Sequence, residues 1–439
     1  MGKISSWCIV GGGILGMSLA LRLAQKGYKV TLFEAESSLG GLVSPFNDSN
    51  LVWDRYYHVI LQSDTLTQGL LQDIKLTECI HWVKAKSGFY ADGRFYSMSN
   101  IWEFLRFPLL SMWNKIRLGL TIYYASKIKN THKLENQTIE EWLIRWSGKA
   151  AFNKIWLPLL RAKLGGTYKE TSASFIQATI SRMYSARNQG QKEEKFGYIP
   201  GGYATILRRF TDHLFDAGVH IMTSHPIQKV KTAHNSQISV TDLNGKKDIF
   251  DQVVLTVPSP LMASLCPDLS KEEQIRLSKT PFLGIVCASL LVKNPLSGFY
   301  ITNIIDASIP FTALIEMTSL TDPRDYNGHS LIYLPKYVSS DDPLFEASDK
   351  NVEQEFTQAF LKMFPQLKQS DISSFRTAKN RYVFSPPQQN NGQPFTSFRT
   401  SVPGIYTVNS AFITDGTLNV NETLALTERA LYELLNETK

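Results

Sequence analysis

Three glycines near the start of the chain have the spacing of a phosphate-binding turn. The apolar run at residues 7–10 predicts a strand, residues 11–16 read G-x-G-x-x-G, and apolar side chains at helical spacing continue to about residue 26. In this context Gly11 permits a tight turn, Gly13 lets the backbone approach a pyrophosphate, and Gly16 lets the helix pack closely on the strand. The amides at the start of the helix and its positive dipole end favour phosphate groups. We therefore expect a dinucleotide site here, with Ile14 and Leu15 among its contacts.

A second predicted strand, residues 28–33, ends at Glu34. This carboxylate follows Gly16 by 18 residues and can accept hydrogen bonds from both hydroxyls of an adenosine ribose. A negative charge there disfavours a 2′-phosphate, so the expected ligand is FAD or NAD, not NADP. An empty unit of this type is the alternative.

A second glycine pair, Gly40-Gly41, lies shortly after the acidic strand end and is followed by Leu42. Residues 34–42 resemble the flavin amine oxidase superfamily, which includes protoporphyrinogen oxidases, phytoene-type desaturases and, more distantly, UDP-galactopyranose mutases. The resemblance implies FAD as the cofactor, with Ala35 beside Glu34 and the glycine pair close to the pyrophosphate. Family members usually carry arginine after the pair, so Leu42 lacks the contact that this arginine makes.

Later segments extend the resemblance along the chain. Residues 196–203 resemble the loop that returns to the FAD domain, and a strand at 226–230 is expected to offer backbone groups near Ile227 to the adenine. At the carboxyl end, a strand, a crossing segment and a helix to about residue 435 resemble the last FAD motif, in which the helix begins at the flavin O2. Where the family has Gly-Asp for the ribityl hydroxyls, this chain has Asn409-Ser410. Either this pair or Asp415 is expected to substitute, with Asn419 at the start of the helix.

Residues 53–60, WDRYYHVI, fall where these flavoproteins place a segment beside the isoalloxazine. The resemblance makes His58 a candidate for the active site, and a structural histidine is the alternative. Arg55 and Tyr57 alternate with it and are candidates for substrate contacts.

Four further residues are candidates from the substrate side. Lys336 ends a predicted strand, and some amine oxidases hold a lysine near flavin N5. Tyr382 is a candidate for the flavin face. Arg161 and Lys163 are candidates for contact with an anionic substrate, although solvated basic side chains are the commoner case.

The order of these segments predicts an α/β protein of two intertwined domains. A discontinuous Rossmann-type FAD-binding domain is expected from residues 1–85, 196–268 and 396–439. An inserted α+β substrate domain with a mixed sheet is expected from residues 86–195 and 269–395, its helical part at about 100–190. An Asp-Gly turn predicts a hairpin at 87–96, and strands near 281–292, 300–303, 310–316 and 331–337 are expected in one sheet.

Composition excludes other classes of protein. The net charge of +7 on 439 residues is a mild basic bias that does not require nucleic acid. The four cysteines are scattered, which excludes CxxC pairs and favours an intracellular, cytoplasmic protein. No histidine, cysteine or acid spacing predicts a metal site, and the oligomeric state stays open.

Residues 100–130 are expected to be helical and are rich in both aromatic and basic side chains. Such a pattern suits peripheral attachment to the inner face of a membrane, and the resemblance implies the same. The interpretation we favour from the sequence is a helical cap that buries these aromatic side chains over the active site.

The resulting hypothesis is an FAD-dependent oxidoreductase of the amine oxidase or protoporphyrinogen oxidase type. It would move a hydride from a C–N or C–C bond of a small, anionic or lipophilic substrate to flavin N5, with oxygen or a quinone as the final acceptor. Two alternatives stay open: a non-redox flavoenzyme acting on a nucleotide sugar or lipid-linked sugar, and an FAD-binding protein without turnover.

Overall fold

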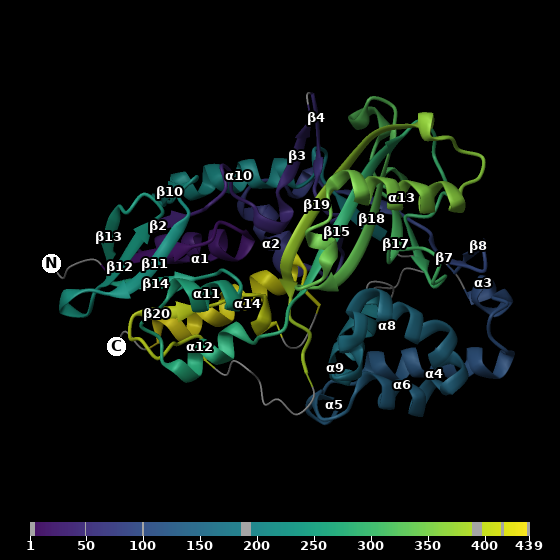
Figure 1. Cartoon of the computed structure of the whole chain (residues 1–439), viewed down its shortest axis with the longest axis horizontal. Helices are drawn as coiled ribbons and strands as arrows, with labels where there is room; N and C mark the ends of the chain where they lie inside the picture. The colour runs from purple at the N-terminus through teal and green to yellow at the C-terminus, as the bar shows by residue number, and fades with distance from the viewer. Residues whose placement is uncertain are drawn as a thin grey trace.

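A five-stranded parallel sheet, which includes the labelled strands β2, β10, β14 and β20, lies at the amino-terminal end of the molecule (Figure 1). The amino-terminal strand β1 is its central strand. The computed structural model describes residues 5–48, 50–98, 101–185, 195–388, 397–413 and 417–436. The strand order is β10-β2-β1-β14-β20, all parallel. The strands are β1 (Ser6–Val10), β2 (Lys29–Phe33), β10 (His220–Met222), β14 (Gln252–Leu255) and β20 (Ile405–Thr407). The sheet is therefore assembled from three separate stretches of the chain.

Helices enclose this sheet and complete the first hydrophobic core. The parallel sheet and these helices form the first lobe of the molecule. Helix α1 packs against β2 and against both α10 and α14, which places the first and last helices side by side. The helices of this lobe are α1 (Ile14–Gln25), α2 (Thr65–Asp73), α10 (Gly202–Asp216), α11 (Ser259–Leu265), α12 (Lys271–Ser278) and α14 (Val420–Leu435). Strands such as β1 read as unbroken apolar runs because both faces of the sheet are covered.

Three small sheets flank the parallel sheet. A hairpin, β3 (Pro45–Asp48) with β4 (Leu51–Asp54), leads out of the glycine-pair segment. The second is formed by β11 (Ile227–Thr232), β12 (Ile238–Asp242) and β13 (Lys247–Phe250), and the third by β5 (Ile60–Leu61), β9 (Lys195–Tyr198) and β6 (His81–Lys84).

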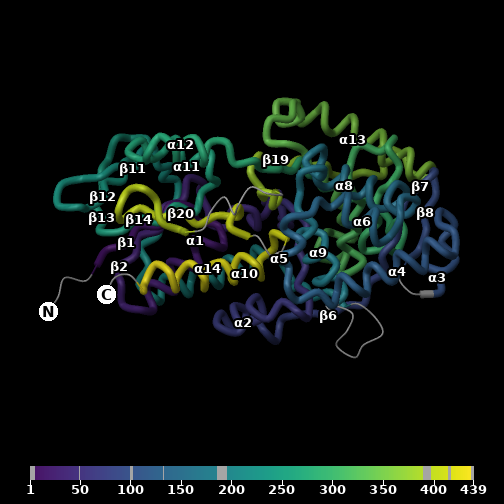
Figure 2. Tube along the Cα trace, turned by 90° about the horizontal axis from the view of Figure 1, so that it is seen from below, coloured from purple at the N-terminus to yellow at the C-terminus, as the bar shows by residue number. Residues whose placement is uncertain are grey.

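A mixed seven-stranded sheet occupies the other end of the molecule in both views (Figures 1 and 2). This sheet and the helices that cover it form the second lobe. Its order is β19-β15-β18-β17-β16-β7-β8. The strands are β7 (Ser87–Ala91), β8 (Arg94–Ser97), β15 (Leu283–Val292), β16 (Ile301–Ile304), β17 (Ala313–Glu316), β18 (Ser330–Ser339) and β19 (Ile372–Phe384). Asp92 and Gly93 both have positive φ, as a two-residue hairpin turn requires, so the predicted hairpin is confirmed.

The seven-stranded sheet is covered on both faces, and all ten residues of β15 are buried. Val286 and Ala288 face the helix α13 (Asp349–Met363), whereas Ile285 and Cys287 face the opposite core. That second core is completed by a helical segment: α3 (Ile101–Arg106), α4 (Met112–Lys127), α5 (His132–Glu135), α6 (Ile139–Ser147), α7 (Lys149–Ala151), a π-helical turn (Phe152–Trp156), α8 (Leu157–Leu164) and α9 (Ala173–Ser185). The predicted α/β class with a Rossmann-type sheet and a mixed sheet is confirmed.

Residues 101–106 and 112–127 are helical as expected, but the prediction that this segment buries its aromatic side chains is wrong for its two tryptophans. The helix is interrupted after Arg106 because Pro108 lacks the amide that a continuous helix needs, and α4 begins at Met112. Phe107 is buried, whereas the largest aromatic side chains of the segment are exposed. Trp102, Trp113 and Leu120 are 70%, 68% and 62% exposed.

Candidate functional site

The glycine-rich turn between β1 and α1 is packed tightly at two glycines and open at the third. Gly11 has φ of +113°, which L side chains rarely adopt. A Cβ on Gly16 would lie 1.9 Å from the carbonyl oxygen of Gly11, so only glycine fits. A Cβ on Gly13, by contrast, would meet no protein atom within 4 Å. The turn therefore leaves open space at Gly13, the position where the sequence predicts the pyrophosphate.

Helix α1 also begins without a cap of its own. Its N-cap residue is Gly13, no side chain accepts a hydrogen bond there, and the first turn, which starts with Ile14 and Leu15, contains no acidic residue. Amides at a helix start need acceptors, and the positive dipole end favours an anion. The residues present thus fit a diphosphate.

Glu34 lies at the end of β2 with its carboxylate against this turn. Its Oε2 accepts a hydrogen bond from the Gly12 amide at 2.6 Å, and its Oε1 accepts one from the Glu36 amide at 2.9 Å. Two backbone amides thus orient the carboxylate beside the predicted phosphate site, and Ala35 next to it is exposed.

The second glycine pair crosses directly over the turn. The Gly40 amide donates to the Gly12 carbonyl at 2.8 Å, and a Cβ on Gly41 would lie 3.2 Å from the Cα of Gly13. Leu42, which follows, is half-buried and packs against the core of the second lobe. The pair lets two backbone segments approach each other on one side of the open space.

The β10–β11 loop lies along the Glu34 segment, because the amides of Ser224 and His225 donate to the carbonyls of Glu36 and Glu34 at 2.8 and 2.9 Å. Ile227 begins β11 directly afterwards and is half-buried. The backbone just before Ile227 is therefore hydrogen-bonded to the Glu34 segment, which is compatible with the predicted adenine contact.

The two carboxyl-terminal candidates for contact with the ribityl hydroxyls are Asn409 and Asp415. Asn409 is buried, its Nδ2 donates to the Val257 carbonyl and the Ser259 hydroxyl at 3.1 Å each, and its Oδ1 accepts from the Ala411 amide. Both N–H groups of the side-chain amide are used within the protein, so the Asn409 side chain anchors a turn and has no donor left for a ribityl hydroxyl. Asp415 lies outside the described residues.

Asn419 caps α14, since its Oδ1 accepts from the Glu422 amide at 3.0 Å. The predicted helix to about residue 435 is confirmed. Its first turn contains Glu422, so this helix start is less positive than that of α1.

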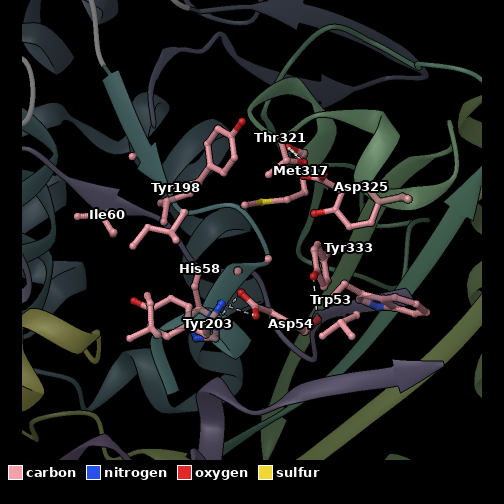
Figure 3. Close-up of a pocket in the computed structure, with 18 residues that line it drawn as sticks. Trp53, Asp54, His58, Ile60, Tyr198, Tyr203, Met317, Thr321, Asp325 and Tyr333 are labelled. Atoms are coloured by element: carbon pink, nitrogen blue, oxygen red, sulfur yellow. Dashed lines mark hydrogen bonds and ion pairs between the residues drawn. The ribbon is translucent and has the colours of Figure 1, made fainter. Parts of the chain in front are cut away.

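His58 and Asp54 share a pocket between the two lobes (Figure 3). The pocket encloses about 540 Å³, including space open to solvent. Its lining comes from β4, the β9–α10 turn, the segment 317–326 and β18. His58 Nδ1 lies 4.0 Å from Asp54 Oδ2, too far for a hydrogen bond, and its ring packs on Tyr203 with centroids 5.0 Å apart.

Asp54 ties three elements together. Its Oδ1 accepts from the Tyr203 amide at 3.0 Å, at the start of α10, and its carbonyl accepts from the Tyr333 hydroxyl at 2.7 Å. Burial raises the pKa of Asp54 to about 7 and lowers the pKa of His58 to about 4. Between these values the carboxyl is protonated and the imidazole neutral, so a proton in this pocket resides on Asp54.

Tyr57, next in the chain to His58, points toward the seven-stranded sheet. Its hydroxyl lies 3.1 Å from the Tyr337 hydroxyl, and the Nζ of Lys163 lies 5.5 Å from the centre of the Tyr337 ring. Two of the predicted substrate contacts, Tyr57 and Lys163, thus both contact Tyr337. The other two lie elsewhere: Arg161 is exposed on α8, and Arg55 donates to the Pro45 carbonyl at 3.3 Å in the β3–β4 hairpin.

Lys336 does not face this cluster. Side chains alternate along β18, so Lys336 lies on the opposite face from Tyr337 and its Nζ is 3.8 Å from Glu355 of α13. Lys336 is therefore not part of the candidate site. Tyr382 packs edge-on against Phe282 at 5.7 Å and against the core of the first lobe.

The sequence did not reveal that Asp54 is a buried carboxyl. It also did not reveal the ion pair between Arg182 and Asp64, in which Arg182 Nη2 lies 3.1 Å from Asp64 Oδ2. The spacing of Asp54, four residues before His58, was the available signal. Among the described residues no cluster of histidine, cysteine and acidic side chains could hold a metal ion. In the same part of the chain, no helix is both long and apolar enough to cross a membrane.

Comparisons with known proteins agree with this geometry. The family model of flavin containing amine oxidoreductases matches residues 16–417. A 15-cis-phytoene desaturase of an Oncidium hybrid cultivar is 20% identical over 404 residues, covering 86% of this chain and 68% of the relative. A zeta-carotene desaturase of Synechocystis is 21% identical over 432 residues, covering 86% of this chain and 87% of the relative.

Solved structures show the same fold at low identity. A structure assigned as a protoporphyrinogen oxidase from Exiguobacterium has a TM-score of 0.76 at 17% identity and covers 98% of this chain and 99% of its own. A reduced UDP-galactopyranose mutase has a TM-score of 0.75 at 15% identity and covers 100% and 95%. The family match spans most of the chain, and the folded glycine motifs agree with it. The chain therefore belongs to the flavin-containing amine oxidoreductase family.

Proposed function

We propose that this protein binds FAD and oxidises a C–N or C–C bond of a small-molecule substrate. When bound, FAD supplies a hydride acceptor at N5, and the substrate loses that hydride and a proton as the double bond forms. The chain itself supplies position, exclusion of water and charge.

The observation that carries this proposal is the open, uncapped start of α1. Gly13 faces empty space although its φ of −71° and ψ of 175° suit any residue. The protein's own packing gives no reason for glycine at this position, whereas a bound diphosphate does.

This difference defines the experiment. Gly13→Ala and Gly13→Val should fold as well as the wild type but should lose most or all of the bound flavin, because the added carbons occupy the phosphate position. Gly69→Ala on α2 is the matched control, since its Cβ also meets no atom within 4 Å. Flavin content is read from the absorbance of purified protein and from FAD released on denaturation. Colourless wild-type protein that takes up no FAD, or normal flavin content in Gly13→Val, would contradict the proposal.

A non-redox reaction on a nucleotide sugar or lipid-linked sugar is the second candidate. It is favoured by Lys163, a half-buried cation over the ring of Tyr337, because a cation in this position suits a diphosphate-bearing substrate. Anaerobic reduction separates the two candidates: an oxidase consumes one equivalent of substrate as its flavin is bleached, whereas a mutase turns over only in the reduced state. An FAD-binding protein without turnover would neither bleach its flavin with substrate nor convert substrate in the reduced state.

We also propose that the exposed face of α4 contacts an anionic membrane surface. Trp113, Ile116, Leu120 and Tyr123 are exposed and recur at helical spacing, so they form one apolar stripe. Residues 101–135 contain six basic and two acidic side chains, a net charge of +4. Tryptophan and tyrosine with basic neighbours suit the headgroup region of a bilayer.

Co-sedimentation with vesicles of phosphatidylcholine and phosphatidylserine tests this contact. Wild-type protein should pellet, and the Trp102→Ala/Trp113→Ala double variant should stay in the supernatant. Phe215→Ala/Tyr432→Ala removes two exposed aromatic side chains elsewhere and should pellet like the wild type. If wild-type protein stays in the supernatant, or if both double variants pellet equally, the α4 face is not the contact.

A further inference from the structure

We propose that Lys163, together with the hydroxyls of Tyr57 and Tyr337, binds the acid group of an amphipathic organic acid, and that such acids are the substrate class of this enzyme. The inference rests on the proposed function, because it concerns the substrate side of the same flavin site.

Three separate parts of the chain converge on this cluster. Lys163 is on α8, Tyr337 is on β18, and Tyr57 lies in the segment that follows β4. The Thr312 hydroxyl donates to the Ala162 carbonyl at 3.0 Å, which fixes this turn of α8 to the sheet. All three side chains of the cluster are half-buried, so each keeps a part that solvent reaches. The cluster is therefore a positioned set of polar groups and not a chance surface contact.

The ammonium of Lys163 contacts the face of the Tyr337 ring, which carries no negative charge to neutralise it. Among the described residues, no carboxylate lies within ion-pair distance of its Nζ. Asp64, the acid of the neighbouring Arg182, already accepts hydrogen bonds from that arginine and from the Leu61 amide at 2.9 Å. Burying a cation costs free energy unless an anion pairs with it. The absence of a partner in this part of the chain leaves that role to a ligand.

The surroundings of Lys163 already disfavour its protonated, positively charged form. Burial, with a smaller contribution from the nearby charge of Arg182, lowers the pKa of Lys163 to about 8. A bound anion would offset both causes. Lys163 is thus mostly protonated at neutral pH but poorly solvated, and its charge is available to an incoming acid.

The two tyrosines add a hydrogen-bond donor. In a hydroxyl pair only one O–H is donated to the partner, which leaves the second O–H free. An ammonium and a phenol O–H are both donors, so the group they suit is an acceptor without protons of its own, such as a carboxylate.

Apolar side chains surround the polar groups. Phe384 lies 6.3 Å from the Tyr337 ring and stacks on Phe175 at 6.1 Å, and Leu159 packs against the same core. A ligand that meets both environments has an acid group and an apolar body. An aliphatic amine would meet an unneutralised cation instead, so amines are disfavoured as substrates.

Three eight-carbon probes with different head groups test the inference. Binding of octanoate, 1-octanol and octylamine to the protein as purified is measured by isothermal titration calorimetry. Octanoate should bind at least tenfold more tightly than octanol, and octylamine should bind more weakly than octanol. Lys163→Met should weaken octanoate binding at least tenfold and change octanol binding less than twofold, whereas Lys163→Arg should retain most of the octanoate affinity. Lys169→Met, an exposed lysine shortly after α8, is the control and should behave as wild type.

Flavin content is measured on every sample, which separates the two proposals. Colourless wild-type protein contradicts FAD binding, whatever octanoate does. Yellow protein that binds octanoate and octanol equally, or whose octanoate affinity survives Lys163→Met, overturns the acid site. Loss of flavin in Lys163→Met also overturns it, because the lysine would then serve the cofactor and not the substrate.

Discussion

Asp54 offers a quantitative test of the pocket between the lobes. We expect Asp54→Asn to stabilise the protein at alkaline pH and to leave its stability nearly unchanged at acidic pH. The amide keeps an Oδ1 that can accept from the Tyr203 amide, so the link between β4 and α10 survives the substitution. What the substitution removes is the negative charge.

The magnitude follows from the pKa of this buried carboxyl, which is raised from 3.8 to about 7. A folded-state pKa above the unfolded value means that the folded protein holds the proton more tightly. The stability gained in this way is fully present below pH 3.8 and is lost as pH rises through about 7. The full shift corresponds to about 4 kcal/mol, of which about 2.5 kcal/mol is lost between pH 5 and pH 8.

Thermal unfolding midpoints at pH 5 and pH 8 measure this difference. For a chain of this length, 2.5 kcal/mol corresponds to about 3 °C. The midpoint of wild-type protein should therefore fall by about 3 °C more than that of Asp54→Asn between the two pH values. Asp325→Asn is the control, because Asp325 lines the same pocket but is exposed, and its pH response should match the wild type.

Equal pH responses of wild type and Asp54→Asn would refute the reasoning. They would mean that Asp54 is ionised in the folded protein at pH 5, as it would be if His58, 4.0 Å away, were protonated and paired with it. A loss of stability in Asp54→Asn at both pH values would show instead that the carboxylate is needed as a charged acceptor at the start of α10.

Two further substitutions test the packing that supports the site. Gly16→Ala should yield little folded protein, because its Cβ would lie 1.9 Å from the Gly11 carbonyl oxygen, and circular dichroism of any soluble fraction would reveal a native-like exception. Arg182→Met should lower the free energy of unfolding by about 3 kcal/mol, because it leaves the buried Asp64 carboxylate without its cation. In urea titrations Arg324→Met, which removes an exposed and solvent-screened ion pair, should change the same quantity much less than Arg182→Met does.

The sequence predicted the first lobe well because local rules determine it. The glycine spacing, the apolar strands and the acid after β2 each have a backbone reason, and the first strand, helix and second strand follow one another within residues 6–34. Strands β7, β8 and β15 to β18 of the seven-stranded sheet were also predictable, since a run such as β15 is apolar throughout when both faces are covered. The edge strand β19 was missed, because most of its residues are only half-buried and polar residues interrupt its pattern.

The side-chain assignments were less predictable because they depend on contacts between distant segments. Lys336 was expected at the flavin, but the face on which a strand residue lies is set by its partners, and α13 takes that face. Asn409 has a residue type that suits a sugar hydroxyl, yet its donors are used by Val257 and Ser259, about 150 residues away. No local pattern contains this information.

The helical segment at residues 101–185 shows a different limit of prediction from sequence. Periodicity of apolar residues indicates that a helix has an apolar face, but it does not indicate what covers that face. On α4 the buried side contains Lys115, Leu118, Thr121 and Ala125, whereas the exposed side carries larger apolar side chains. The more hydrophobic face is the one turned outward, which a burial rule based on hydrophobicity predicts in reverse.

The outward face of α4 and the inward cation of α8 are physically independent, although both suit molecules with an apolar body and an acid group. Lys163 is close to Tyr337 of the sheet, whereas Trp113 and Leu120 are exposed on a different helix. If both proposals hold, the two functions must separate on mutation. Lys163→Met should pellet with vesicles as the wild type does, and the Trp102→Ala/Trp113→Ala variant should bind octanoate with unchanged affinity. Loss of both properties in either variant would indicate a folding defect of the helical segment, and neither proposal would then be supported by that variant.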